Sequence, residues 1–127
     1  MLKNNFIILL ITFLFFQVSS FSNEEKFLSL KKDKVNVRYG PGFDFPVKYI
    51  YKKINLPIKQ IDKKENFRRI IDYKKNSGWI HISQLKKVNS VITEENKILF
   101  NRPTIFSKPI ANINKGRLLV INKCEKK

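Results

Sequence analysis

Residues 34–47 read KVNVRYGPGFDFPV, and this stretch decides the fold class of the chain. Val35 and Val37 alternate with polar neighbours, which is the pattern of a half-buried β-strand. The strand then runs into a Gly-Pro-Gly turn that two phenylalanines follow. Three interpretations are open for this turn: a phosphate cradle, a ligand-binding loop, or a tight corner in a small β-domain.

The phosphate cradle is the weakest of the three interpretations. Such cradles present glycine amides to phosphate at the N-terminus of a helix. Pro41 removes one of these amides, and no helical pattern follows the turn. A tight corner accounts better for Gly40 and Gly42, because glycine permits a positive φ and a sharp turn around the proline.

The aromatic residues of the loop keep the ligand-binding interpretation open. Tyr39, Phe43 and Phe45 lie in the loop, and Trp79 lies on a later strand. Together they would line a groove that holds an extended peptide by apolar and stacking contacts. Tyr39 and Trp79 favour the groove because each carries a polar atom suited to a half-wet site. Phe43 and Phe45 fit equally well as caps on the end of the domain.

Working outward, turn residues punctuate short strand-like runs roughly every eight to twelve positions, which predicts a small all-β sandwich or barrel. We expect strands at 27–30, 35–38, 47–51, 56–61, 67–73 and 79–82, a hairpin turn at 62–66, and a short helical turn at 83–85. The domain spans residues 27–88. A chain of this size is marginally stable, so most of its large apolar residues should be in the core. The predicted core consists of Val35, Val37, Val47, Ile50, Ile58, Ile61, Ile70, Ile80, Ile82 and Leu85.

The pattern partly repeats after a predicted linker at residues 89–96. KILFN at 97–101 mirrors KVNVR at 34–38, and LLVINK at 118–123 mirrors the strand around Ile58. The repeat, residues 97–127, stops before any counterpart of residues 67–85. A half-barrel cannot close its edges or bury its apolar face. We therefore expect the sequence to be a fragment of a longer chain, or its tail to pack on the first domain or on another chain.

The first 22 residues have the layout of a secretory signal peptide. Lys3 precedes the apolar run FIILLITFLFF at 6–16, and small residues follow near Ser20 and Ser22. Eleven residues rise only about 16 Å as a helix, too little to span a bilayer. Export, to the periplasm or the cell exterior, with no stable membrane insertion after cleavage, is the expectation.

The sequence offers little for catalysis or metal binding. It has one histidine, His81, and one cysteine, Cys124. Neither a nucleophile-base pair nor a zinc site with four ligands is indicated. His81 is expected at the rim of a strand, and the unpaired Cys124 fits an unfinished repeat. We expect no enzyme activity, no cofactor and no metal.

The formal net charge of +16 would ordinarily suggest an acidic polymer as partner. Of the 26 basic residues, however, 21 are lysines, scattered in pairs where turns are expected. Lysine, Asn, Ile and Phe are all abundant and share A/T-rich codons, so much of the charge reflects composition and a solvated surface. Nucleic acid is not the expected partner.

The motifs together resemble one family. NVR at 36–38, GPG at 40–42 and the later SGWI at 77–80 resemble the opening and the Gly-Trp strand of bacterial Src-homology-3 (SH3) domains, above all the exported type of Gram-negative bacteria. Phe67 stands where the family usually has tryptophan, which is a departure at a possible ligand platform. The resemblance implies a small β-barrel with five to six strands and no catalytic residue.

The resemblance also implies a function. Relatives accompany cell-wall hydrolases and are thought to engage peptidoglycan or its stem peptides. We therefore expect a non-enzymatic module of the cell envelope whose groove is Tyr39, Phe43, Phe45 and Trp79. Arg38, Gly40, Pro41 and Gly42 would be architectural, with Arg38 donating to loop carbonyls. The alternative is a periplasmic protein-protein adaptor that does not bind cell wall. The oligomeric state is left open.

Overall fold

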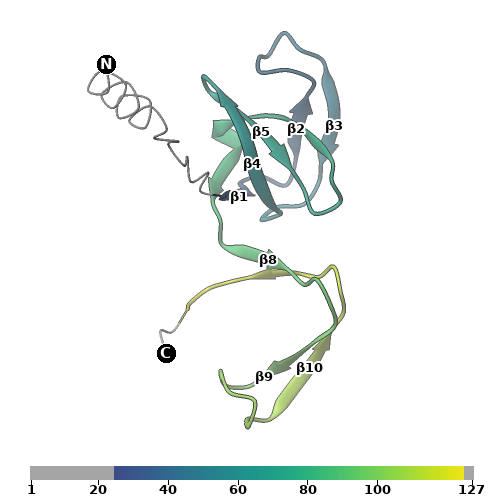
Figure 1. Ribbon diagram of the computed structural model, residues 1–127, viewed down its shortest axis with the longest axis vertical. Helices are drawn as coiled ribbons and strands as arrows, with labels where there is room; N and C mark the ends of the chain where they lie inside the picture. Colours follow the sequence, from purple (N-terminus) through teal and green to yellow (C-terminus); the bar gives the residue numbers. More distant parts are fainter. Residues whose placement is uncertain (1–24, 125–127) are drawn as a thin grey trace, which may run out of the picture.

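The computed structural model describes residues 25–124, so the predicted signal peptide at 1–22 lies outside the described residues (Figure 1). The described chain is almost entirely β-structure, which confirms the predicted fold class. The first domain consists of β1 (Lys26–Leu30), β2 (Val35–Arg38), β3 (Val47–Tyr51), β4 (Pro57–Lys64), β5 (Phe67–Ile71), β6 (Ser77–His81), the 3-10 turn η1 (Ile82–Gln84) and β7 (Leu85–Lys87).

Seven strands form one antiparallel sheet in the order β3-β2-β6-β5-β4-β1-β7, which Figure 1 shows curled into a small barrel. The hairpin β4–β5 and the hairpin β5–β6 supply its longest pairings. The turn between β4 and β5 is shorter than expected, because β4 continues to Lys64 and only Glu65 and Asn66 turn. Glu65 takes a positive φ of 50° there. The seventh strand, β7, which the sequence did not suggest, pairs with β1.

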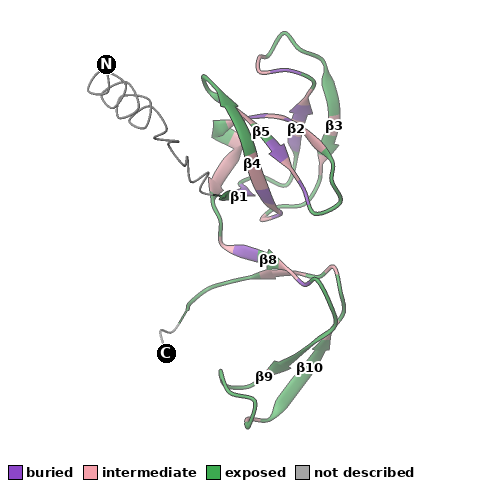
Figure 2. Cartoon of the chain, in the orientation of Figure 1, coloured by how far each residue is buried: buried purple, intermediate pink, exposed green. Residues whose placement is uncertain are grey.

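One small group of buried aliphatic residues forms the core of the barrel, and Figure 2 colours buried residues purple along its strands. They come from β1, β2, β4, β5 and β6 and the turn before β4, so nearly every strand contributes one or two. Half-buried residues from β3, β7 and the segment beyond the barrel extend this core. The buried cluster consists of Leu30, Val35, Val37, Leu56, Ile58, Ile70 and Ile80.

Four residues of the predicted core are exposed. Ile50 is exposed because β3 is the outer strand of the sheet and turns Tyr49 and Tyr51 toward the core instead. Val47 is exposed because the register between β2 and β3 shifts beyond Tyr49, so that Val47 pairs with Arg38. Ile61 is exposed because the register of β4 shifts between Gln60 and Asp62, where it pairs with β5. Ile82 is exposed where η1 ends the alternation of β6.

The two inward tyrosines join the edge strand to the β5–β6 turn through hydrogen bonds. The hydroxyls of Tyr49 and Tyr51 are 3.2 Å apart, and Tyr51 donates to Asp72 Oδ2 at 2.9 Å. Asp72 is buried, and it also accepts from the amides of Lys74 and Asn76. This network satisfies the buried carboxylate and holds the outer strand against the middle of the sheet.

The remaining strands form a C-terminal unit, residues 89–124. It contains β8 (Ser90–Ile92), β9 (Lys97–Phe100), β10 (Pro109–Ile113) and β11 (Leu118–Val120), in the pairs β8–β11 and β9–β10. These pairs correspond in chain order to β1–β4 and β2–β3 of the barrel. That they form an incomplete second copy remains a prediction.

The unit is attached to the barrel by buried contacts at β8. Ser90 is 2% exposed, its hydroxyl lies 3.0 Å from that of Ser29 on β1, and it also donates to the carbonyl of Asn55. Ile92 and Leu118 pack against the barrel core. The stretch 89–96, expected to be a linker, thus contains a strand that is docked on the domain.

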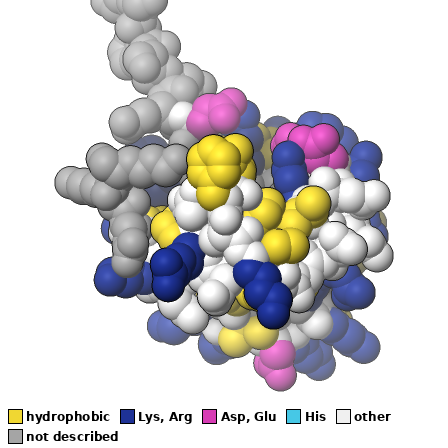
Figure 3. Space-filling view, turned by 90° about the horizontal axis from the view of Figure 1, so that it is seen from below, with side chains coloured by type: hydrophobic (Ala, Val, Ile, Leu, Met, Phe, Trp, Pro, Cys, Tyr) yellow, Lys and Arg dark blue, Asp and Glu magenta, His cyan; other side chains and the backbone are white. Residues whose placement is uncertain are grey.

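The C-terminal unit carries the two most exposed large apolar side chains among the described residues. Figure 3 views it from below and shows apolar side chains between basic ones. Phe106 is 93% exposed and Ile105 is 75% exposed, and both lie in the turn between β9 and β10. Further exposed residues are Ile98, Leu99 and Ile110.

The core can be tested by truncating Ile80, which is fully buried. We expect Ile80→Ala to lower the free energy of unfolding by about 2–5 kcal/mol, because the lost methylenes leave a cavity. Ile105→Ala is the matched control and should change it by less than about 0.5 kcal/mol. Urea denaturation followed by circular dichroism measures both, and equal effects of the two variants would contradict the assignment of the core.

The tyrosine network predicts a loss of stability in alkali. Burial, followed by the hydrogen bonds to Tyr49 and Asp72, raises the pKa of Tyr51 above its ordinary value of about 10. The folded state therefore holds the proton more tightly than the unfolded state. The resulting stability is complete below about pH 10 and declines as the pH rises beyond it.

Tyr51→Phe should make this decline shallower while costing about 1 kcal/mol at neutral pH through the lost hydrogen bond to Asp72. Tyr73→Phe removes an exposed hydroxyl and is the matched control. Urea unfolding between pH 8 and about pH 11 provides the measurement. A Tyr51→Phe slope equal to that of the wild type would show that the network does not contribute.

Candidate functional site

Arg38, the last residue of β2, holds the Gly-Pro-Gly loop at residues 39–46 in place. Its Nη1 atom donates to the carbonyl oxygen of Phe43 at 3.2 Å and to that of Phe45 at 2.8 Å. The amide of Tyr39 donates to the carbonyl of Pro46 at 3.2 Å and closes the base of the loop. One nitrogen can serve both carbonyls at once because Nη1 carries two N–H groups.

The glycines of the loop are required for close contact and not for a positive φ, which corrects the expectation from the sequence. A positive φ is found at Gly116 and not at Gly40 or Gly42. The ring of Phe45 lies over Gly40, and a Cβ atom there would be 2.4 Å from two ring carbons. At Gly42 the nearest obstacle is the movable carboxylate of Asp44.

A further glycine, Gly78, lets β6 approach β2. A Cβ atom at Gly78 would lie 2.3 Å from Cγ1 of Val37 and 3.1 Å from the backbone oxygen of Arg38. The Gly-Trp pair of the sequence motif thus has two separate tasks. The glycine closes the barrel, and Trp79 becomes the Cα partner of Arg38 on one side and of Arg69 on the other.

Phe43 packs over an aromatic cluster outside the barrel core. Its ring centroid lies 5.2 Å from that of Phe67 and 5.0 Å from that of His81, and these two are 5.2 Å apart. The guanidinium carbon of Arg38 lies 5.5 Å from the Phe43 ring. Phe67 is buried beneath this contact, yet Phe43 itself remains 63% exposed.

Trp79 lies on the same side of β6 as His81, two residues away, and is half-buried. His81 contacts the Phe43 ring. Arg38 is the Cα partner of Trp79 and also holds the loop through its hydrogen bond to Phe45. Trp79, His81, Phe43 and Arg38 therefore form one continuous surface. In the part of the chain that the structure describes, no ring stacking joins Trp79 to Tyr39, Phe43 or Phe45. Arg38 links the two, because it pairs with Trp79 across the strands and its guanidinium lies over the Phe43 ring.

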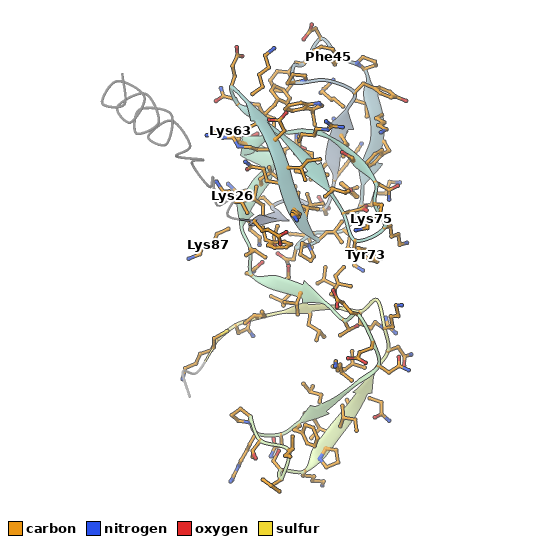
Figure 4. The ribbon with its side chains drawn as sticks, in the orientation of Figure 1. Lys26, Phe45, Lys63, Tyr73, Lys75 and Lys87 are labelled. Atoms are coloured by element: carbon orange, nitrogen blue, oxygen red, sulfur yellow. The ribbon has the colours of Figure 1, made fainter. Side chains whose placement is uncertain are left out.

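Tyr39 extends this surface at one side and is 62% exposed. The ammonium of Lys48 lies 5.7 Å from its ring centroid and donates to the carbonyl of Ser77 on β6 at 2.9 Å. Phe45, labelled near the tip of the loop in Figure 4, is 41% exposed because one face of its ring covers Gly40. We call Tyr39, Phe43, Trp79 and Arg38 the aromatic face.

The sequence did not reveal the support beneath this face. From the sequence, Phe67 stood out only because the family usually has tryptophan at a possible ligand platform there, and His81 was expected at the rim of a strand. In the structure both hold Phe43 from below, and His81 Nδ1 lies 2.8 Å from the hydroxyl of Ser83. Phe67 and His81 are cross-strand partners on β5 and β6, so correct pairing of these strands would have brought them together.

The chemistry of the face is that of noncovalent recognition. Exposed rings offer stacking and apolar contact, while Arg38, Lys48 and Arg69 offer positive charge beside them. Within residues 25–124, no three His, Cys, Asp or Glu side chains gather closely enough to hold a metal ion. No helix within these residues has the length and apolar character needed to cross a membrane.

The contrast between the two loop glycines gives a test of the loop. Gly40→Ala should displace the Phe45 ring and destabilise the domain by about 1–3 kcal/mol, because the ring cannot move without loosening the loop. Gly42→Ala should cost less, since the Asp44 carboxylate can turn away and the Phe45 ring, 3.3 Å from the added Cβ, needs to move only slightly. Urea denaturation, together with NMR shifts of the Phe45 ring protons, distinguishes them. Equal costs would contradict the packing described for Gly40.

Comparison with known proteins agrees with this geometry. No curated protein matches the chain. The family model described as bacterial SH3 domain matches residues 31–87, a range that runs from the end of β1 to the end of β7 and holds the loop, Arg38 and Trp79. Residues 31–87 of this chain are therefore a bacterial SH3 domain, as the NVR, GPG and GW motifs predicted.

Proposed function

We propose that the aromatic face binds peptidoglycan, through the stem peptides of the cell wall, in the periplasm. Bacterial SH3 domains are binding modules and are often associated with the cell wall. The observation that carries the proposal is the exposure of Tyr39 and Phe43, both above 60%, in a loop that Arg38 ties to the barrel.

A fixed and exposed ring favours binding for a physical reason. Holding a side chain before the ligand arrives lowers the entropy that binding must offset. Tyr39 and Phe43 are held by the hydrogen-bonded loop and by contacts with Lys48, Phe67 and His81. Both side chains are therefore exposed to solvent but held in one position, which is the condition expected of a recognition surface.

The charges beside the rings suit a ligand with carboxylates. Arg38 and Arg69 flank Trp79 along the sheet, and Lys48 lies beside Tyr39. Stem peptides carry free carboxylates and an extended backbone. Their apolar groups would pack on the rings while their carboxylates would pair with these cations.

The site in this proposal differs from the groove expected from the sequence. Tyr39, Phe43 and Trp79 form an open face around Arg38, and Phe45 serves partly to shield Gly40. The proposed location, periplasmic or extracellular, is supported by the signal-like opening residues and by the frequent occurrence of bacterial SH3 domains in exported proteins.

The second candidate function is an envelope adaptor that binds another protein and not the cell wall. The exposed apolar residues of the C-terminal unit, including Phe106 and Ile105, favour it. Exposed patches of this kind commonly mark protein contacts. Association that depends on protein concentration, with no retention by peptidoglycan, would support the adaptor.

Cosedimentation with purified peptidoglycan sacculi tests the primary proposal. We expect the sacculi to retain the chain at physiological salt, and Tyr39→Ala or Phe43→Ala to weaken retention about tenfold, as loss of an aromatic anchor does. Phe106→Ala is the control, because it removes an even more exposed ring from the C-terminal unit, outside the aromatic face. None of these changes alters the charge of the chain.

Two results would contradict the proposal. The first is that sacculi retain nothing at physiological salt. The second is that both face variants bind as strongly as the wild type, which would mean that retention reflects only the positive charge of the chain.

A further inference from the structure

One end of the barrel collects the lysines of two segments that are far apart in the sequence. The turn between β1 and β2 covers residues 31–34, and the segment between β3 and β4 covers residues 52–56. All five lysines in these segments are exposed, although the C-terminal unit is attached close by, at Asn55. We call this surface the basic end, and its lysines are Lys31, Lys32, Lys34, Lys52 and Lys53.

Backbone pairing brings the two segments together. The Cα partners Val35 and Tyr51 lie at this end of β2 and β3. The lysine directly before Val35 and the lysine directly after Tyr51 are therefore neighbours. The amide of Asn55 also donates to the carbonyl of Leu30 at 3.0 Å, which joins the second segment to the end of β1. The order of the strands thus gathers lysines that the sequence keeps apart.

Gln84 of η1 holds the first turn at both of its ends. Its backbone carbonyl accepts from the amide of Lys31 at 2.8 Å, and its side-chain Oε1 accepts from the amide of Asn36 at 3.2 Å. Leu30 and Val35, which flank the turn, are fully buried. The lysines of this turn are therefore carried by backbone that is fixed to the barrel.

The positive charge of the basic end is almost unopposed. Asp33 is the only acid among residues 31–34 and 52–56, so the five lysines leave a net charge of +4 on these segments. The ion pairs found among residues 25–124 are at Lys59 and Lys97, and neither involves a lysine of the basic end. A concentration of one sign of charge on a fixed surface attracts anions.

Two features favour the surface of a membrane over a dissolved anion. All the cations of the basic end are lysines, whose ammonium groups act as point charges and lack the fork with which arginine recognises a single phosphate or carboxylate. Ile54 lies in the turn that the hydrogen bond from Leu56 to Lys53 closes, and it is 48% exposed. An apolar side chain beside a lysine cluster suits an anionic membrane, where apolar burial adds to the attraction of charge.

We propose that the basic end binds peripherally to the surface of a membrane that carries anionic phospholipids. The five lysines lie near the lipid phosphates, and Ile54 enters the boundary between head groups and acyl chains. The basic end and the aromatic face lie at opposite ends of β2, whose four residues extend about 13 Å. The two surfaces are therefore independent, and the chain can use both at once.

Sedimentation with lipid vesicles tests the proposal. The probe is a vesicle of phosphatidylglycerol and phosphatidylcholine in equal parts, and the protein is the chain from Asn23 onward, the form expected after removal of the signal peptide. We expect these vesicles to retain the chain and vesicles of phosphatidylcholine alone not to retain it. Lys52→Gln combined with Lys53→Gln should weaken binding about tenfold, because each lysine near such a surface adds to the attraction.

Lys63→Gln combined with Lys64→Gln is the matched control. It removes the same charge at the β4–β5 hairpin, where Figure 4 labels Lys63 and where Asp62 and Glu65 flank the two lysines. Binding to the vesicles should stay close to that of the wild type. The lysines changed in both double variants are exposed, so neither change should unfold the domain.

A third variant separates a membrane from a dissolved polyanion. Ile54→Ser keeps every charge but removes the exposed apolar side chain. It should weaken binding to the vesicles about fivefold, because apolar burial in the interface is lost. The salt concentration at which the chain elutes from immobilised heparin should not change, since heparin offers charge and no apolar layer.

Three results would overturn the proposal. If phosphatidylglycerol does not increase retention, the basic end does not bind anionic lipid. Equal losses in the two lysine double variants would indicate attraction to the net charge of the whole chain. Unchanged vesicle binding of Ile54→Ser would indicate a surface for polyanions in general. Phe43→Ala should leave vesicle binding unchanged, so failure of the basic end and failure of the aromatic face are distinguishable.

Discussion

The two hydrogen bonds from Arg38 to the carbonyls of Phe43 and Phe45 are the interaction on which the aromatic face depends. They hold a loop of glycine, proline and aromatic residues in one position at the end of the sheet. Arg38 is at the same time the Cα partner of Trp79. One side chain thus sets both the position of the loop and its relation to the strand that carries the tryptophan.

The barrel can support such a surface because its core and its aromatic face use different residues. The core is a compact group of Leu, Ile and Val, and the rings lie outside it. Gly78 allows β6 to approach β2, and Gly40 allows the Phe45 ring to lie flat on the loop. The residues that identify the bacterial SH3 family here are therefore mainly scaffold, and the rings that we propose for binding stand on it.

The sequence predicted those parts of the fold that depend on local alternation. Val35 and Val37 alternate in a single strand, and both are fully buried. The choice between Ile50 and Tyr51 on β3 could not be made in this way, because either residue suits a half-buried edge strand and only the buried partner Asp72 selects the tyrosine. The irregular pairing near Ile61 likewise depends on the partner strand.

The remaining features that could not be predicted from the sequence are contacts between residues far apart in the chain. Phe43, Phe67 and His81 meet only after β5 and β6 have paired, so their cluster has no signature in any single stretch. The hydrogen bond between Ser29 and Ser90 is of the same kind. Each serine is an ordinary polar residue in its own segment, and together they attach the C-terminal unit to the barrel.

The most direct measurement of the central claim uses Trp79, the only tryptophan of the chain, as its own reporter. Soluble stem peptides released from peptidoglycan would be titrated into the protein while the emission of Trp79 is followed. If the aromatic face binds these peptides, the emission changes in a saturable way, and the change is lost in Phe43→Ala but kept in Phe106→Ala. Emission that stays constant, or that changes equally in both variants, would contradict the claim that this face recognises the cell wall.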